Sequence, residues 1–273
     1  MAGPAYREWL PQAALRRHLV CTWAARAGDG GEPHFDRVLP DGCMDLVWTG
    51  EEVVIAGPDT RASAIPERPG GVWAGVRFPP GVAPALLGVP ASALVDRRVS
   101  LAEVLDGARA RALEDRLAAA PSLPACARAL EDAVLAWLPA SAAPDHLVAG
   151  AVQALRAGAA GSEPRVAQLA RALGASERQL NRRCVAAVGY GPKMLQRVLR
   201  FRRFLALTAA RDRDAPPAGG AGSRASRSGA GRPRLALLAA LAGYADQAHL
   251  GRDCQELAGV SPSRLAGRPF TMG

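Results

Sequence analysis

The chain has 273 residues, of which 49% are hydrophobic and 22% are charged, a balance typical of a globular protein with one or two domains. The longest apolar run, Leu235 to Ala245, has 11 residues, whereas a membrane-spanning helix needs about 20, so we expect no membrane partner. The run Leu19–Ala25 favours an interior strand over a signal peptide, which makes the cytoplasm the expected location. Five scattered cysteines without a Cys-x-x-Cys pair argue against a zinc ribbon or a disulfide scaffold.

The first half of the chain predicts short strands followed by helices. Runs of β-type residues separated by turn residues cover Phe35–Leu39, Met44–Trp48, Val53–Ala56 and Val72–Phe78. A helical pattern then extends from Ser100, with a capping box at Glu103, to about Ala119, and a second one covers Pro124 to Leu138. Pro139 to Pro144 has the composition of a linker. We therefore expect residues 1–140 to form a small β domain backed by helices.

A cluster of polar residues lies near these predicted strands: His34, Asp41, Cys43, Asp45 and Arg77. The cluster lacks the His-x-His pattern of a metal-binding cupin. The chain also shows no phosphate loop, dinucleotide fingerprint or Gly-x-Ser-x-Gly motif, so we expect no catalytic residue, metal or cofactor. A tight turn at 41–45 is the preferred interpretation, and a ligand site is the alternative.

Charge separates the two halves of the chain. Residues 1–144 carry a net charge of −3 and residues 145–273 a net charge of +12, within a formal total of +9. A strongly basic segment attracts polyanions, because each neutralised phosphate releases condensed counterions. The second half therefore predicts nucleic acid as the partner, with a well-solvated arginine-rich surface as the alternative.

The second half contains an internal repeat. When the chain is shifted by 70 residues, segments 175–195 and 245–265 agree without a gap at seven positions. These are Ala175/Ala245, Leu180/Leu250, Arg182/Arg252, Cys184/Cys254, Gly189/Gly259, Pro192/Pro262 and Leu195/Leu265. Each copy has the layout of a helix-turn-helix: a short helix at Val166–Leu173 or Leu235–Ala242, then a glycine turn and a second helix.

Capping signals and polar side chains mark the second helix of each copy. Ser176, with Gln179 completing a capping box, and Asp246 are the predicted N-caps. Leu180 and Cys184 lie four residues apart and are predicted to face the core. The polar face of the first copy carries Arg178, Gln179, Asn181 and Arg182, and that of the second carries Gln247, His249 and Arg252 beside the small Ala248. Arginine can bind guanine through two hydrogen bonds, and asparagine or glutamine can do so with adenine. Ser176, Arg183 and Lys193 are the predicted phosphate contacts.

A long helix is predicted between the two copies. It begins at Pro192, a favoured first residue, and runs to about Ala210, a length of roughly 28 Å at about 1.5 Å per residue. Major-groove segments on one side of DNA lie about 34 Å apart. Such a helix would hold two recognition helices in adjacent grooves without requiring a dimer.

Segment 145–268 resembles the AraC/XylS family of bacterial transcription regulators. The resemblance is carried by Ala242–Cys254 (AGYADQAHLGRDC), by Leu257–Leu265 (LAGVSPSRL) and by Gly189–Leu195 (GYGPKML). It implies a sequence-specific binder of double-stranded DNA that recruits or blocks RNA polymerase. By matching position, Arg178, Gln179, Asn181 and Arg182 fall on the first recognition helix, and Gln247, Ala248, His249 and Arg252 on the second.

The first half is similar to a poorly characterised domain found ahead of such DNA-binding units. Leu39–Trp48, Ala56–Arg61 and Gly75–Gly81 carry that resemblance. In the family, N-terminal domains are often small β-barrels that bind a small-molecule effector or form a homodimer. The expected fold is thus α+β: a β-barrel-like (cupin-like) domain with helices, followed by an all-α tandem helix-turn-helix domain.

Two features depart from the family. The family usually has phenylalanine where Cys184 and Cys254 stand. Segment 211–234 is an insertion of 24 residues, 22 of them Gly, Pro, Ser, Ala or Arg, and is predicted to be disordered. Because its six arginines could bind phosphates without regard to sequence, a nonspecific, architectural nucleic-acid binder is an alternative function. A cysteine-based enzyme with Cys43 as nucleophile is a third, less favoured alternative.

Overall fold

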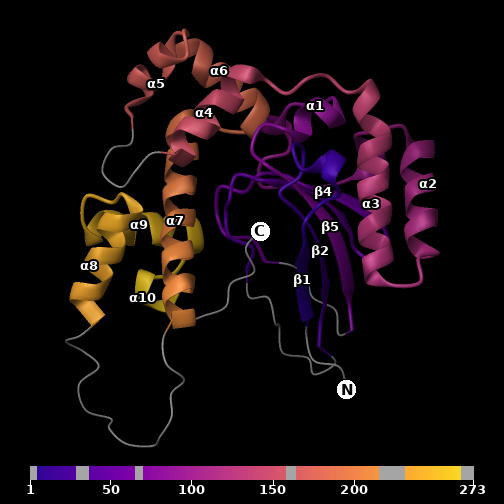
Figure 1. Cartoon of the computed structure of the whole chain (residues 1–273), viewed down its shortest axis with the longest axis horizontal. Helices are drawn as coiled ribbons and strands as arrows, with labels where there is room; N and C mark the ends of the chain where they lie inside the picture. The colour runs from indigo at the N-terminus through magenta and orange to yellow at the C-terminus, as the bar shows by residue number, and fades with distance from the viewer. Residues whose placement is uncertain (1–4, 29–36, 65–69, 158–163, 215–230, 266–273) are drawn as a thin grey trace, which may run out of the picture.

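The computed structural model describes residues 5–28, 37–64, 70–157, 164–214 and 231–265. Its architecture is α+β, as expected: the strands lie in the first 100 residues, and helices make up the second half (Figure 1). None of the helices in these ranges is both long enough and apolar enough to cross a bilayer.

Six strands form one antiparallel sheet in the order β1-β2-β5-β3-β4-β6. The strands are β1 (Ala5–Trp9), β2 (Cys21–Arg26), β3 (Met44–Trp48), β4 (Val53–Ala56), β5 (Val72–Phe78) and β6 (Arg98–Ser100). The bounds of β3, β4 and β5 are those predicted, and β2 confirms the interior strand expected near Leu19–Ala25.

The sheet is open, so the prediction of a β-barrel-like (cupin-like) domain is wrong. Strands β1 and β6 are its two edges and do not pair with each other in the part of the chain that the structure describes. Helices provide the physical reason: they pack on one face of the sheet and bury its apolar side chains, so closure is not needed to form a core.

Two other predictions for the first half need correction. Within Phe35–Leu39, Val38 forms only an isolated bridge with Ser63, and residues 35 and 36 lie outside the described ranges. The helix expected from Ser100 to Ala119 is interrupted after a 3₁₀ turn at Leu101–Glu103, although the Ser100–Glu103 capping box is present. Asp106 is the N-cap of a new helix that begins at Gly107.

The helices of the first half cover the sheet. Short elements are α1 (Ala83–Leu87) and the 3₁₀ turns Ala13–Leu15, Ala91–Ala93 and Leu138–Ala140. The longer helices α2 (Gly107–Ala118) and α3 (Leu123–Trp137) lie side by side, and α3 packs on β2 and β5 (Figure 1). Buried Glu131 of α3 accepts hydrogen bonds from the Thr22 hydroxyl and the Gln12 backbone N–H, which ties the helix to the sheet.

The second half is helical throughout its described residues. Its helices are α4 (His146–Ala157), α5 (Val166–Ala172), α6 (Glu177–Val188), α7 (Pro192–Asp214), α8 (Gly231–Ala242), α9 (Gln247–Ala258) and α10 (Pro262–Leu265). The predicted linker, Pro139 to Pro144, begins within the 3₁₀ turn Leu138–Ala140 and precedes α4, a helix that was not predicted. Of the segment 211–234 that is predicted to be disordered, residues 211–214 belong to α7 and residues 231–234 to α8, and residues 215–230 lie outside the described ranges.

The first half of the chain is docked onto the C-terminal helices. Leu39 is buried in the core formed by helices α4 to α10 rather than in the core behind the sheet. The Ala62 N–H donates to the carbonyl of Leu257 at the end of α9, at 2.7 Å. Gly189, at the end of α6, approaches Pro58 so closely that a Cβ there would lie 2.7 Å from the proline Cγ. The loop that follows β4 therefore touches both α6 and α9.

Candidate nucleic-acid interface

Helices α5 and α6 form the first pair that the repeat predicts. Gly174 adopts φ +68° in the turn between them, and the Ser176 hydroxyl accepts a hydrogen bond from the Gln179 N–H at 3.2 Å. This confirms Ser176 as the N-cap of α6. Leu180 and Cys184 are fully buried, as predicted, and burial raises the pKa of the Cys184 thiol to about 11, so it is a neutral core side chain.

Helices α8 and α9 form the second pair with matching features. Gly243 has φ +95°, and the Asp246 carboxylate accepts from the His249 N–H, which confirms Asp246 as the N-cap of α9. Leu250, Cys254 and Leu257 are buried in the common helical core. Burial also raises the pKa of the Cys254 thiol to about 12.

On α6, the four side chains predicted to read bases are all exposed: Arg178, Gln179, Asn181 and Arg182. Together with Ser176 and Val185 they line a shallow hollow of about 530 Å³. The Oδ1 of Asn181 would lie 2.4 Å from a Cβ at Gly191. Glycine at position 191 therefore leaves room for the side-chain amide of Asn181. Arg178 and Arg182 are exposed to solvent on α6.

On α9, the predicted residues fall into two groups. Ala248 and Arg252 are exposed, whereas Gln247 and His249 are half-buried. The His249 ring meets the Tyr244 ring edge to face, with 5.2 Å between centroids. Packing thus fixes the direction of His249, and Arg252 is the more accessible polar side chain of this helix.

The three predicted phosphate contacts have different surroundings. Lys193 is exposed in the first turn of α7, and the exposed Ser176 uses its hydroxyl oxygen in the cap of α6. Arg183 is half-buried, and its Nε lies 2.6 Å from an Asp145 carboxylate oxygen. Since Asp145 also accepts from the first backbone N–H groups of α4, the pair ties α4 to α6.

An ion-pair network that the sequence analysis missed joins α9 to α7. Asp253 is 3% exposed and accepts from Arg197 at 2.9 Å and from Arg200 at 3.5 Å. Arg197 also pairs with Glu256, and Arg200 lies over the Tyr244 ring. The spacing of three residues within each charged pair places Arg197 and Arg200, and Asp253 and Glu256, on one face of their helices, but their meeting depends on how α7 and α9 pack.

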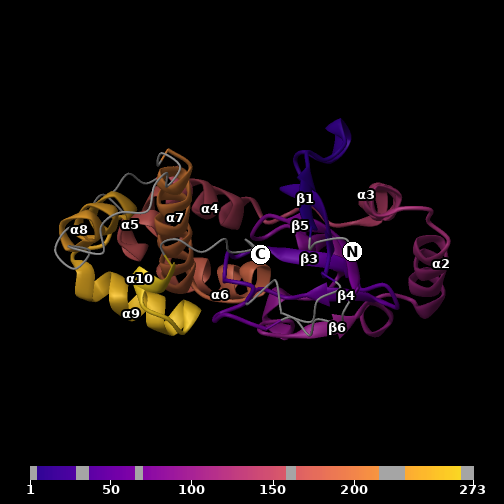
Figure 2. The same cartoon turned by 90° about the horizontal axis from the view of Figure 1, so that it is seen from below.

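The two pairs are arranged about α7. Figure 1 shows α5 and α6 at one end of α7 and α8 and α9 beside its other part, and Figure 2 shows α6 and α9 along the same side of the C-terminal helices. Helices α6 and α9 therefore lie on one side of the C-terminal helices.

The polar cluster predicted around the turn 41–45 lies away from this surface. Gly42 has φ +82°, and Asp41 accepts from the Cys43 N–H at 2.7 Å, which confirms the tight turn. His34 lies outside the described residues. No group of three metal-ligating side chains occurs within the described ranges.

Comparison with known proteins gives a family match for residues 7–100. No curated protein matches the chain. Residues 7–100, which contain all but the start of the six-stranded sheet, match a family described as a domain of unknown function, DUF6597.

Proposed function

We propose that the chain is a sequence-specific DNA-binding transcription regulator. Segment 145–268 supplies two helix-turn-helix units of the AraC/XylS type, with α6 and α9 as recognition helices. Residues 1–140 form a unit that senses an effector or mediates a homodimer, and the regulator acts by recruiting or blocking RNA polymerase.

One observation carries the proposal: two N-capped helices that lie on one side of the C-terminal helices both bear exposed polar side chains. Arg178 and Arg182 on α6 and Arg252 on α9 are exposed, while the opposite faces of both helices are buried. The 23 residues of α7 correspond to roughly 35 Å, close to the spacing of about 34 Å between successive major-groove segments. The net charge of +12 over residues 145–273 supports a polyanionic partner.

The surroundings of Cys43 favour this proposal over the cysteine-based enzyme. Burial and the nearby Asp41 raise the pKa of the Cys43 thiol well above its ordinary value. The thiol is therefore protonated at neutral pH, whereas a nucleophilic cysteine acts as the thiolate.

The test is selection of binding sites from random duplex DNA, followed by titration of the selected and scrambled duplexes with Arg182→Ala. Loss of a two-hydrogen-bond contact to a base is expected to cost about 1–3 kcal/mol on the selected duplex and to relax the preference at one base pair. The matched control is Arg128→Ala, which removes an exposed arginine from α3, on the other half of the chain. It is expected to leave affinity for the selected duplex nearly unchanged.

An equal loss on selected and scrambled duplexes would assign Arg182 to a phosphate. If selection itself yielded no preferred sequence and affinity fell steeply with salt, the nonspecific, architectural binder would replace the regulator.

A further inference from the structure

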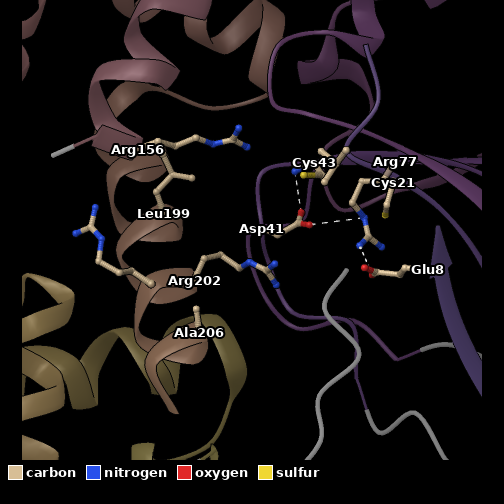
Figure 3. Close-up of a pocket in the computed structure, with 11 residues that line it drawn as sticks. Glu8, Cys21, Asp41, Cys43, Arg77, Arg156, Leu199, Arg202 and Ala206 are labelled. Carbon is tan, nitrogen blue, oxygen red and sulfur yellow. Dashed lines mark hydrogen bonds and ion pairs between the residues drawn. The ribbon is translucent and has the colours of Figure 1, made fainter. Parts of the chain in front are cut away.

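A polar pocket of about 410 Å³ lies between the sheet and the C-terminal helices, away from the proposed recognition surface. Figure 3 shows side chains entering it from two sides, strands on one and helices on the other. The strand side supplies Glu8, Val20, Cys21, Asp41, Cys43 and Arg77, and the helix side supplies Arg156, Leu199, Arg202, Arg203 and Ala206.

Arg77 is held in place by carboxylates. Its side chain is 6% exposed, and its Nε and Nη2 donate to the two Asp45 oxygens at 3.1 and 3.0 Å. Its Nη1 lies 3.6 Å from Glu8. Against the opposing effect of burial, the carboxylates of Asp45 and Asp41 raise the pKa of Arg77 well above its ordinary value, so its positive charge is already balanced within the protein.

Asp41 has an oxygen that forms no hydrogen bond within the protein. Its side chain is 9% exposed, and Oδ1 accepts from the Cys43 N–H. The buried Oδ2 has no hydrogen-bond partner and lies 3.9 Å from the Arg77 Nε. A buried acceptor without a partner costs about 1–3 kcal/mol, so natural proteins seldom retain one without a use for it.

Arg202 of α7 presents the complementary feature from the helix side. Its Nη1 is buried and has no hydrogen-bond partner. Figure 3 shows its guanidinium, and that of Arg156 from α4, extending toward the strand side of the pocket. The residues that line the pocket therefore include a donor, Arg202 Nη1, and an acceptor, Asp41 Oδ2, that lack a hydrogen-bond partner within the protein. Among the lining residues four are arginines and two are acidic, and Arg77 is further neutralised by Asp45.

We propose that this pocket binds a small organic anion bearing a hydroxyl or amino group. Its carboxylate or phosphate pairs with Arg202 and Arg156, and its hydroxyl or amino group donates to Asp41 Oδ2. The volume lies within the range of small-molecule sites, about 300–1,000 Å³. Because the ligand contacts the sheet and α7 together, it bridges the two halves of the chain. The binding does not require DNA, so it stands or falls separately from the proposed regulator function.

The test uses two matched pairs of anions with the full-length protein in isothermal titration calorimetry. L-malate is compared with succinate, and glycerol 3-phosphate with propyl phosphate; the first member of each pair differs from the second only by its hydroxyl groups. We expect saturable binding of at least one hydroxyl-bearing anion, tighter than that of its partner. Arg202→Gln is expected to weaken this binding about tenfold or more, the effect of losing one charge-assisted hydrogen bond. Asp41→Asn is expected to weaken the hydroxyl-bearing anion more than its partner.

Two further variants keep the test decisive. Ala206→Phe fills the pocket from the exposed face of α7 without removing a charge and is expected to abolish binding. Arg171→Gln removes an exposed arginine of α5 outside the pocket and is expected to leave binding unchanged. The absence of saturable binding by all four anions would overturn the proposal. Binding that survives Ala206→Phe, or that Arg171→Gln weakens as much as Arg202→Gln, would also overturn it.

Discussion

At the scale of single residues, the buried carboxylate of Asp41 is expected to lower the stability of the free protein at neutral pH. Burial raises the pKa of Asp41 above its ordinary value, despite the opposing attraction of Arg77 and Arg202. A carboxyl group with a raised pKa in the folded state stabilises the fold fully below the unfolded-state pKa, and this contribution is lost as pH rises through the folded-state pKa. The charged carboxylate of Asp41 is therefore expected to lower the free energy of unfolding at neutral pH, and binding of the proposed ligand would offset this loss.

Asp41→Asn is accordingly expected to increase the free energy of unfolding at pH 7, because asparagine keeps the acceptor for the Cys43 N–H and carries no charge. The gain should shrink as the pH falls toward 4, where the aspartate is increasingly protonated. Urea titrations at the two pH values measure this difference. Asp115→Asn, on the exposed face of α2, is the control and should change little. A loss of stability at pH 7 would mean that attraction to the arginines outweighs burial.

Gly189 is a second residue whose replacement has a defined structural cost. Its φ of +94° disfavours any other residue, and a Cβ would lie 2.7 Å from Pro58 and 2.8 Å from Val95. Gly189→Ala is expected to lower the free energy of unfolding by about 2–4 kcal/mol, from backbone strain and overlap together. Gly174 has φ +68° and open space around it, so Gly174→Ala should cost only the strain, about 1–2 kcal/mol. Equal losses in thermal or urea unfolding would show that Pro58 and Val95 yield without cost.

Residue types and spacing were sufficient to predict the repeat, both N-caps and the burial of Cys184. These features depend on local geometry: a side-chain oxygen reaches a backbone N–H three residues on, and residues four apart share a helix face. The contacts of His249 with Tyr244 and of Arg183 with Asp145 were not predictable, because they depend on how helices pack. For the same reason, the sequence did not indicate that Asp41 and Arg202, far apart in the chain, face one pocket.

At the scale of elements, the ion pairs between α7 and α9 are expected to fix the second helix pair. Asp253→Ala would leave Arg197 and Arg200 without their shared carboxylate, and loss of one partner from a largely buried network is expected to cost about 2–4 kcal/mol. Glu256 is 60% exposed, so Glu256→Ala should cost less than about 1 kcal/mol. Urea unfolding measures both losses, and hydrogen exchange should show faster exchange in α9 for Asp253→Ala. Similar losses for the two variants would contradict a burial-dependent role.

Element boundaries followed from sequence where the signal was local. Strands β3, β4 and β5 have the predicted bounds because turn residues flank short apolar runs. Edge strand β1 contains two adjacent charged residues, and β6 has only three residues, so neither gave a recognisable pattern. Whether the sheet closes is a property of pairing between distant strands and of the helices that cover it. The barrel expectation came from family resemblance, and the order of the strands overturned it.

At the scale of the whole molecule, the N-terminal half connects the two proposed recognition helices. The loop after β4 contacts the end of α6 through Pro58 and the end of α9 through the Ala62 N–H. Arg37 adds a hydrogen bond to the carbonyl of Ala258, also at the end of α9. Helix α7 also contacts both α6 and α9. Because both the loop after β4 and helix α7 connect α6 to α9, we expect the distance between these two helices to be fixed.

A fixed separation has a testable consequence for DNA binding by the proposed regulator. Insertion of about 5 bp between the two halves of a selected site rotates one half away from the protein by half a helical turn, and insertion of about 10 bp restores the direction but adds about 34 Å. A rigid protein should lose one of its two contacts in both cases, so both insertions should reduce affinity to that of an isolated half-site. Fluorescence anisotropy with the three duplexes provides the measurement, and a duplex with the same insertion outside the site is the control. Recovery of affinity with the longer insertion would show that α6 and α9 move independently, and neither α7 nor the loop after β4 would then set their spacing.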